Sequence, residues 1–337
     1  MTAQMPSSPG EPFRDLHDSA IVFDGSMVVE LSDAHIERMR AGGVTAVNHT
    51  VSHPYADTRT ALAQINETRR WIDAHADAVT LAHTPDEIRA AKADGKEAIV
   101  FGPQDTEMIG GDLDLLGTFY DLGVRILQLT YQRQNLVGAG CGEAVDGGLT
   151  AYGREFVAEM NALGILVDVS HCGQQTGYGA MDASDRPVIV SHSFSNALSP
   201  HMRAKDDDFI RALAAQGGVI GITTLSGFLY YPEDRQRHPD LKRFVEHVSH
   251  VADIAGIDAV AIATDYEETL YEDAYNASHV PALVGGWDFA RRRAIGMEDG
   301  SRFGNFTTAL KEGGFNDDEV RKILGENWLR ALGAAQS

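Results

Sequence analysis

Short apolar runs alternate with longer segments of helical period along most of the chain. Parallel strands that are covered on both faces read as nearly continuous apolar runs, and the helix between two of them has a period of about 3.6 residues. The alternation therefore predicts strand-helix units and a closed parallel barrel. Eight runs are predicted as strands: Ala20 to Asp24, Val44 to His49, Glu97 to Gly102, Val124 to Tyr131, Ile165 to His171, Pro187 to His192, Gly218 to Thr223 and Ala259 to Asp265.

Capping signals predict where several helices begin and end. Thr84-Pro85-Asp86-Glu87 has the pattern of a capping box with proline at the first helical position. Asn316 followed by Glu319 predicts the start of another helix. Gly42 and Gly43 are typical of a helix end, because glycine adopts the left-handed conformation without strain.

The domain organisation follows from the absence of a dividing linker. We expect a single α/β domain over residues 15–337, a TIM-like (β/α)8 barrel, preceded by a flexible N-terminal leader over residues 1–14. The connection from Glu267 to Phe303 is too long for a simple turn. It is predicted to be a lid over the site or an excursion of the chain.

Charge and composition narrow the classes of partner. The 28 lysines and arginines against 49 aspartates and glutamates give a formal charge of −21, and 43% of the residues are apolar. Such a charge repels phosphate backbones and anionic lipids, so we expect neither nucleic acid nor a membrane as a partner. Cys141 and Cys172 are the two cysteines. With no disulfide framework and no apolar run of about 18 residues, the chain is predicted to be cytoplasmic.

Polar residues gather at the predicted strand ends, and in a barrel these ends share the face that holds the active site. Two histidines on successive strands, with an aspartate on the last strand, indicate a metal ion and a group that moves protons. One such histidine would more often be structural, whereas the combination favours a site. The strand-end residues are Asp24, His49, Gln104, Tyr131, His171, His192 and Asp265.

Five stretches of the chain carry a recognisable pattern: Leu122-Gly-Val-Arg-Ile-Leu-Gln-Leu-Thr130, Gly148-Leu-Thr-Ala-Tyr-Gly-Arg-Glu155, Met160-Asn-Ala-Leu-Gly-Ile-Leu-Val-Asp-Val-Ser-His171, Pro187-Val-Ile-Val-Ser-His192 and Gly325-Glu-Asn-Trp-Leu-Arg330. They resemble the membrane (renal) dipeptidase family of zinc amidohydrolases and follow one another in the family's order over about residues 20–332. The resemblance covers nearly the whole chain and supports the barrel.

The resemblance implies roles for individual residues. His171 and His192 match the two histidines that hold one zinc ion in the family. Arg203 matches the arginine that grips the substrate carboxylate through a charge-assisted pair. Asp265 matches the aspartate that handles the proton during attack on the amide, and Tyr131 falls where the family has a substrate-binding histidine.

The other half of the family site is altered in this chain. The family's His-x-Asp metal ligands fall at Ser26 and Val28, and its bridging carboxylate falls at Gln104, or at Asp105 if the alignment shifts by one residue. Valine has no donor atom, and a neutral amide does not balance metal charge. The resemblance therefore predicts one divalent metal, zinc or else iron or another divalent ion, and no second metal.

The resemblance implies metal-dependent hydrolysis of a dipeptide or a small carboxylate-bearing amide. Gln104 and Asn135 are expected to line the cavity and contact the substrate, and Tyr131 to hydrogen-bond the developing oxyanion. The family's preference for dimers suggests a homodimer.

Three alternatives stay open at this level. A mononuclear lyase, decarboxylase or ring-opening enzyme would need only one metal and a carboxylate anchor. A metal-free binding protein could keep the same barrel, because fold alone does not determine function. His49 or His53 could supply a replacement ligand, although a pair of loop histidines without a metal role is the more common case.

Overall fold

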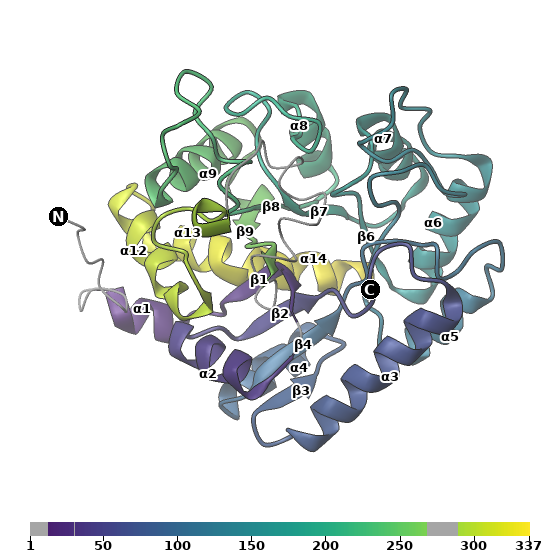
Figure 1. Ribbon diagram of the computed structural model, residues 1–337, viewed down its shortest axis with the longest axis horizontal. Helices are drawn as coiled ribbons and strands as arrows, with labels where there is room; N and C mark the ends of the chain where they lie inside the picture. Colours follow the sequence, from purple (N-terminus) through teal and green to yellow (C-terminus); the bar gives the residue numbers. More distant parts are fainter. Residues whose placement is uncertain (1–12, 30, 268–288) are drawn as a thin grey trace.

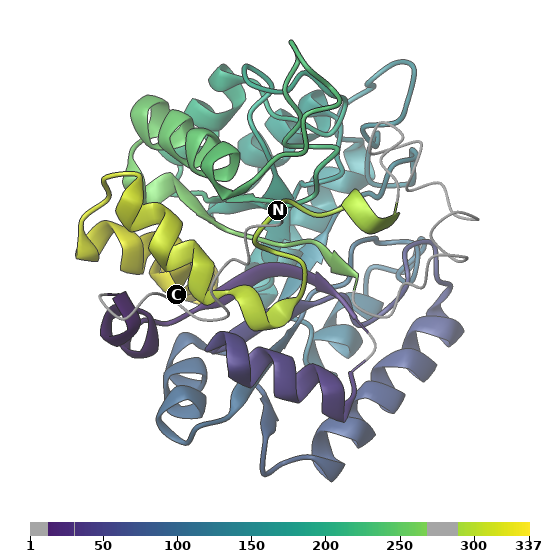
Figure 2. The ribbon, with the colours of Figure 1, turned by 60° about the vertical axis from the view of Figure 1, so that its left-hand side comes forward.

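A ring of parallel strands, surrounded by helices, forms the centre of the molecule (Figure 1). The structure is a computed structural model that describes residues 13–29, 31–267 and 289–337. Figure 2 shows the strands passing through the middle of the molecule with helices on either side. The strands are β1 (Phe23–Val28), β2 (Ala46–His49), β3 (Val79–Leu81), β4 (Glu97–Phe101), β5 (Ile126–Gln128), β6 (Leu166–Asp168), β7 (Val188–Ser193), β8 (Ile220–Ile222), β9 (Val260–Ile262) and β10 (Tyr266–Glu267).

Two five-stranded parallel sheets make up the ring. Their strand orders are β10-β1-β2-β4-β3 and β5-β6-β7-β8-β9. A parallel bridge between Phe101 and Val124 joins β4 to the start of the second sheet. On the other side, β10 follows β9 closely in the chain and pairs with β1 through Met27 and Tyr266. The predicted (β/α)8 barrel is confirmed, with β3 as an additional edge strand outside it.

Alternate residues of the strands face two different cores, so both faces are apolar. One set packs with Trp328 of the C-terminal helix inside the ring: Phe23, Ala46, Ala98, Ile126, Leu166, Ile189, Val219 and Ala261. The other set packs with surrounding helices: Val22, Val47, Ile99, Leu127, Val167, Val188, Ile220 and Val260. This double burial explains why the strands read as continuous apolar runs.

The helices begin and end largely where the capping residues predict. Thr84 and Asn316 each form a capping box, and the left-handed Gly43 ends the second helix. The α-helices are α1 (Arg14–Ser19), α2 (Asp33–Gly42), α3 (Thr58–Ala74), α4 (Pro85–Ala93), α5 (Leu115–Asp121), α6 (Ala151–Leu163), α7 (Gln174–Ala183), α8 (Asp207–Ala215), α9 (Leu241–Ala255), α12 (Gly304–Glu312), α13 (Asp317–Arg321) and α14 (Asn327–Ala335).

Some predicted boundaries need correction. The strand β3 was not predicted, because three residues are too few to show a period. The first strand begins at Phe23 and continues to Val28, so Asp24 lies inside it and not at its end. Glycine is common in turns, yet Gly25 lies within this strand. The position requires glycine because a side chain there would collide with the ring of Trp328.

The predicted leader lies almost entirely outside the described residues, and so does more than half of the predicted lid. Arg14, which was assigned to the leader, is the first residue of α1. Of the predicted lid from Glu267 to Phe303, the structure describes Glu267 and residues 289–303. No helix in the described parts of the chain is long and apolar enough to cross a bilayer.

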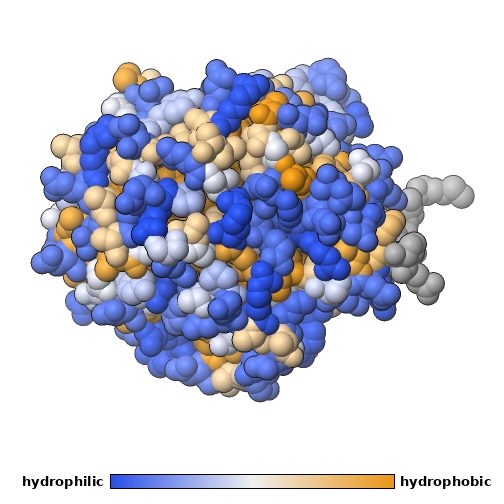
Figure 3. Space-filling view, turned by 180° about the vertical axis from the view of Figure 1, so that it is seen from behind, coloured by the Kyte–Doolittle hydropathy of each residue, from blue (hydrophilic) through white to orange (hydrophobic). Residues whose placement is uncertain are grey.

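The surface is largely hydrophilic on the face opposite the view of Figure 1. Figure 3 shows polar residues over most of that face, with apolar residues in small separate patches. Scattered apolar residues of this kind are normal on a folded protein.

Candidate active site

The imidazoles of His171 and His192 point at each other. Their Nε2 atoms are 2.8 Å apart, and both side chains are buried. His192 lies in β7, and His171 follows β6, the neighbouring strand. Two nitrogens that bind one zinc ion tetrahedrally at about 2.0–2.1 Å each lie about 3.3 Å apart. The structure therefore brings the two predicted metal ligands close together, and a zinc ion between them would require the two Nε2 atoms to move slightly apart.

A hydrogen-bonded chain orients His192. The Ser191 hydroxyl donates to Asp168 Oδ2 at 2.6 Å and lies 2.8 Å from His192 Nδ1. Because the hydroxyl hydrogen is used in the hydrogen bond to the carboxylate, the hydroxyl oxygen accepts a hydrogen bond from the N–H at His192 Nδ1. The Nε2 lone pair is then directed at the site, which is the tautomer that binds a metal.

Burial also keeps this histidine neutral. Burial, together with the charges of Arg203 and Lys205, holds the pKa of His192 well below its ordinary value. The Lys205 ammonium donates to the carbonyl oxygens of Val169 and Cys172, which flank the turn carrying His171. A neutral imidazole is the form in which histidine binds metals.

Tyr131 and Arg203 both lie against the histidine pair. The Tyr131 ring stacks on His171 with 4.0 Å between centroids and 20° between planes. Arg203 is fully buried and donates from Nη1 to the Ser170 carbonyl and from Nη2 to the His192 carbonyl, the latter at 3.1 Å. In this conformation its guanidinium supports the backbone beneath the histidines. Its predicted contact with a substrate carboxylate stays a prediction.

Asp265 follows β9 in a conformation that is unusual for a residue with a side chain. Its φ is 52°, in the left-handed region, and its amide donates to the Ser26 carbonyl at 3.0 Å. Burial raises the pKa of its carboxyl, while the nearby positive charges of Arg203 and Arg293 oppose that rise. Strained backbone of this kind is concentrated at functional sites.

The neighbouring carboxyl of Asp24 holds the chain before Asp265 in place. It accepts hydrogen bonds from the Thr264 amide at 2.7 Å and from the Thr264 hydroxyl. Burial raises the pKa of Asp24 to about 7, although these hydrogen bonds oppose the shift. Asp24 thus connects the first strand to the segment that carries Asp265.

Side chains at the altered half of the site bind one another. Gln104 donates from Nε2 to the Ser26 hydroxyl at 3.2 Å and to the Thr50 hydroxyl at 2.8 Å. Ser26 and Gln104 are two of the residues predicted to replace the ligands of the family's second ion, and that assignment stays a prediction. Here an amide and a hydroxyl satisfy each other directly. Val28, at the third position, offers no donor atom.

Asn135 and Asp105 are occupied in a loop. Asn135 Nδ2 donates to Asp105, Thr106 and the Leu129 carbonyl, and its Oδ1 accepts from two backbone amides. Asp105 Oδ1 also accepts the Thr106 amide at 2.7 Å. These hydrogen bonds connect both side chains to the loop and not to the histidine pair.

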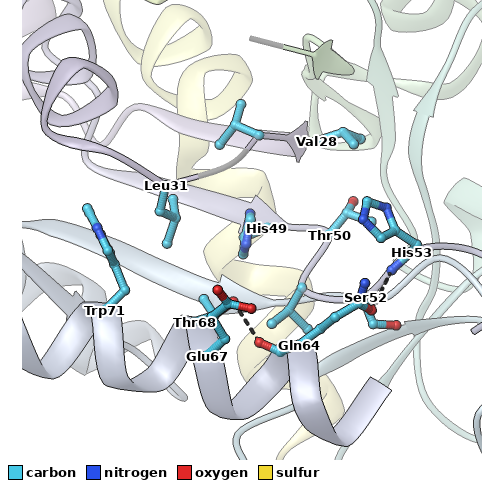
Figure 4. A pocket seen from close by; sticks show the side chains of 12 residues that line it. Val28, Leu31, His49, Thr50, Ser52, His53, Gln64, Glu67, Thr68 and Trp71 are labelled. Atoms are coloured by element: carbon cyan, nitrogen blue, oxygen red, sulfur yellow. Dashed lines mark hydrogen bonds between the residues drawn. The ribbon is translucent and has the colours of Figure 1, made fainter. Parts of the chain in front are cut away.

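A cavity of about 470 Å³ lies between the ends of β1 and β2 and helix α3 (Figure 4). His49, Thr50 and His53 line it, and Thr50 connects it to Gln104. Burial lowers the pKa of His49 to about 3, with a smaller contribution from His35. In the parts of the chain that the structure covers, no three histidine, cysteine, aspartate or glutamate side chains are grouped as a metal site, either around His49 and His53 or around His171 and His192.

The family of this chain is decided by sequence. The profile described as "Membrane dipeptidase (Peptidase family M19)" matches residues 24–285. The chain belongs to this family. The predicted membership of this family is thereby confirmed.

Relatives and a solved structure agree with this assignment. Dipeptidase tcpJ of Claviceps purpurea (strain 20.1) is 30% identical over 82% of this chain, and dipeptidase verJ of Clonostachys rogersoniana is 27% identical over 91%. The matches span 60% of the length of tcpJ and 77% of that of verJ. An amidohydrolase of Pseudomonas aeruginosa superposes with a TM-score of 0.86 at 33% identity, over 95% of this chain and 98% of that one.

Sequence reasoning missed several residues around the site. Asp168 and Ser191 lie within stretches that resemble the family, but their link to His192 depends on which strands are neighbours. Their signal was an acidic or hydroxyl residue inside an otherwise apolar strand. Arg293 is one of three consecutive arginines in the sequence, and only the structure shows that its charge acts on Asp265.

Proposed function

We propose that this protein is a metal-dependent hydrolase of dipeptides or small amides that carry a free carboxylate. The observation that carries the proposal is the convergence of the His171 and His192 Nε2 atoms, 2.8 Å apart, in a member of a dipeptidase family. His171 and His192 would hold one divalent ion, zinc or a related metal. Such an ion, when bound, polarises a carbonyl and activates water.

The proposal of a single ion is supported by the altered half of the site. Ser26 and Gln104 hydrogen-bond to each other, and Val28 is apolar. A second cation there would lack the carboxylates and the imidazole that hold it in the family. We therefore expect one metal per chain.

The remaining residues would bind and orient the substrate and move protons. Asp265 would take the proton from the attacking water and pass it to the leaving amine. Tyr131, stacked on His171, would donate a hydrogen bond to the oxygen of the scissile amide, and Gln104 would contact the substrate beside it. Arg203 would hold the substrate carboxylate only by exchanging its bonds to backbone carbonyls. We assign Asn135 to support of the loop because its amide is fully engaged.

Two further assignments stay predictions. The cytoplasmic location rests on the low cysteine count, and both cysteines are free thiols in the structure. The homodimer rests on the family alone.

Elemental analysis combined with a dipeptide-hydrolysis assay tests the proposal. We expect one ion per chain in the purified protein, and His192→Ala should lose at least nine-tenths of both metal and activity. His250→Ala is the matched control, because His250 pairs with Asp207 on the outside of the barrel. Two ions per chain would contradict the single-ion site, and full hydrolysis by His192→Ala would contradict the assigned ligand.

A further inference from the structure

Arg293 is a buried cation without a hydrogen-bond partner. Its side chain is 4% exposed, and Nε, Nη1 and Nη2 each lack a partner. Its guanidinium lies over the ring of Tyr266, 3.9 Å from the centroid. Stacking covers a face of the planar group and leaves the fork of N–H donors at its edge unused.

The other buried arginines of the described chain have hydrogen-bond partners for terminal nitrogens, although Arg203 Nε lacks one. Arg125, Arg203 and Arg243 each donate to backbone carbonyl oxygens, and Arg243 also pairs with Glu246. A buried guanidinium without such partners destabilises the fold, because it has lost its hydrogen bonds to water and has not replaced them. Arg293 therefore differs from its neighbours in a way that packing alone does not explain.

The position of Arg293 places it at the mouth of the barrel. Arg293 pairs with Leu225, just after β8, and the next amide, of Ala294, donates to the Thr224 carbonyl at 2.9 Å. Its own carbonyl accepts from His238 Nε2 at 2.7 Å. These bonds hold the backbone on both sides of Arg293, so the cation is positioned before any ligand arrives.

Asp265 lies close to this cation. The positive charges of Arg203 and Arg293 both oppose the rise that burial causes in the pKa of Asp265. The two terminal nitrogens of Arg203, however, already donate to the Ser170 and His192 carbonyls. Of the two arginines whose charges act on Asp265, Arg293 is thus the one whose terminal nitrogens have no partner.

We propose that Arg293 is the anion-binding residue of this site and that it pairs with the carboxylate of the ligand. The inference rests on the proposed function for the identity of that ligand, a dipeptide or small acyl amino acid. A guanidinium fork matches a carboxylate through two parallel hydrogen bonds. Because the nitrogens of Arg293 are shielded from water, the pair forms in a setting of low dielectric constant, which strengthens it.

The experiment compares binding of N-acetylglycine with that of its uncharged amide, N-acetylglycinamide, by calorimetry on the metal-loaded protein. The variants are Arg293→Met and Arg293→Lys. The matched control is Arg291→Met, which removes the same charge from the same segment at an exposed contact with the Gln236 carbonyl. Thermal unfolding without ligand reports whether each variant is folded.

We expect the wild type to bind N-acetylglycine at least tenfold more tightly than the amide. Arg293→Met should abolish that preference, Arg293→Lys should retain part of it, and Arg291→Met should leave it intact. Without ligand, Arg293→Met should unfold at the same temperature as the wild type or higher, because an unpaired buried charge is removed. A wild type without the preference, or an Arg293→Met variant that keeps it, would overturn the inference.

The binding assay also separates this inference from the proposed function. If the wild type shows the Arg293-dependent preference but hydrolyses no dipeptide, the anion site stands and the hydrolase assignment falls. If it hydrolyses dipeptides and Arg293→Met keeps the same KM, the hydrolase assignment stands and the anion site falls.

Discussion

At the scale of single residues, the site depends on polar groups that are buried but have named partners. Asp168 sets the tautomer of His192 through Ser191, and Asp24 holds Thr264 next to Asp265. A buried carboxyl stays in place because several donors share it, which offsets the loss of water. Burial nevertheless shifts the pKa of such a carboxyl, so the free energy of unfolding depends on pH.

Asp24 should make the protein less stable as the pH rises from about 4 to 7. Its pKa in the folded protein is about 7, above the ordinary value of 3.8, so the folded state holds the proton more tightly. Its contribution is fully present below pH 3.8 and is lost as the pH rises through 7. The shift corresponds to about 4 kcal/mol, as an order of magnitude.

The measurement is urea unfolding of the wild type and Asp24→Asn between pH 4 and 8. Asparagine keeps an acceptor for the Thr264 amide and cannot ionise. The difference in unfolding free energy between the two proteins isolates Asp24 from other groups such as His49. We expect this difference to change by a few kcal/mol over that range, and a constant difference would contradict the shifted pKa.

At the scale of elements, the fold depends on close contact between β1 and α14. A Cβ atom at Gly25 would lie 2.5 Å from the Trp328 ring and 2.7 Å from the Ser191 carbonyl oxygen. Trp328 in turn donates to the Ile262 carbonyl at 3.0 Å. The C-terminal helix is therefore seated against the strands that carry both halves of the site.

Gly25→Ala should destabilise the protein by about 1–3 kcal/mol, as overpacking of a tight core does. The added methyl would have to displace the Trp328 ring or the backbone of β7. Gly117→Ala in α5 is the matched control, because nothing lies within 4 Å of its Cβ position. The control should be neutral or stabilise the helix by about 0.5–1 kcal/mol. Urea denaturation compares them, and equal stability of Gly25→Ala and wild type would refute the tight contact.

The elements were predicted well where the signal is local. Capping at Thr84 and Asn316 depends only on neighbouring residues. The strands can be recognised because they are runs of apolar residues. The continuation of β1 beyond Asp24 could not be predicted from the sequence. Gly25 is required there by its close contact with Trp328, which is about three hundred residues away in the chain. The three-residue β3 was missed for lack of length.

At the scale of the whole molecule, the barrel brings together positions that are far apart in the sequence. Ser26, Gln104 and Thr50 meet in one hydrogen-bonded group, and His171 meets His192. The parallel arrangement places the carboxyl ends of all these strands on one face. The proposed number of metal ions therefore depends on groups that only the assembled barrel brings together.

Restoring the family's ligands should add a second metal. The triple variant Ser26→His, Val28→Asp and Gln104→Glu supplies an imidazole and two carboxylates at the end of β1 and just after β4. Carboxylates balance the charge of a second ion, so we expect elemental analysis to rise from one ion per chain to two.

Ser26→His alone is the control and should leave the metal content unchanged. Circular dichroism shows whether the triple variant keeps its fold. A folded triple variant that still holds one ion per chain would show that the altered residues do not limit metal binding.

The sequence by itself determined the barrel, the family and the pair of histidines, because apolar alternation and local motifs do not depend on distant contacts. Only the tertiary structure decided which polar groups are satisfied. It showed that Arg203 is engaged by carbonyls while Arg293 is not, and that Ser26 and Gln104 bind each other. Hydrogen-bond partners across a barrel are set by which strands lie side by side and in what register, and no local pattern encodes that.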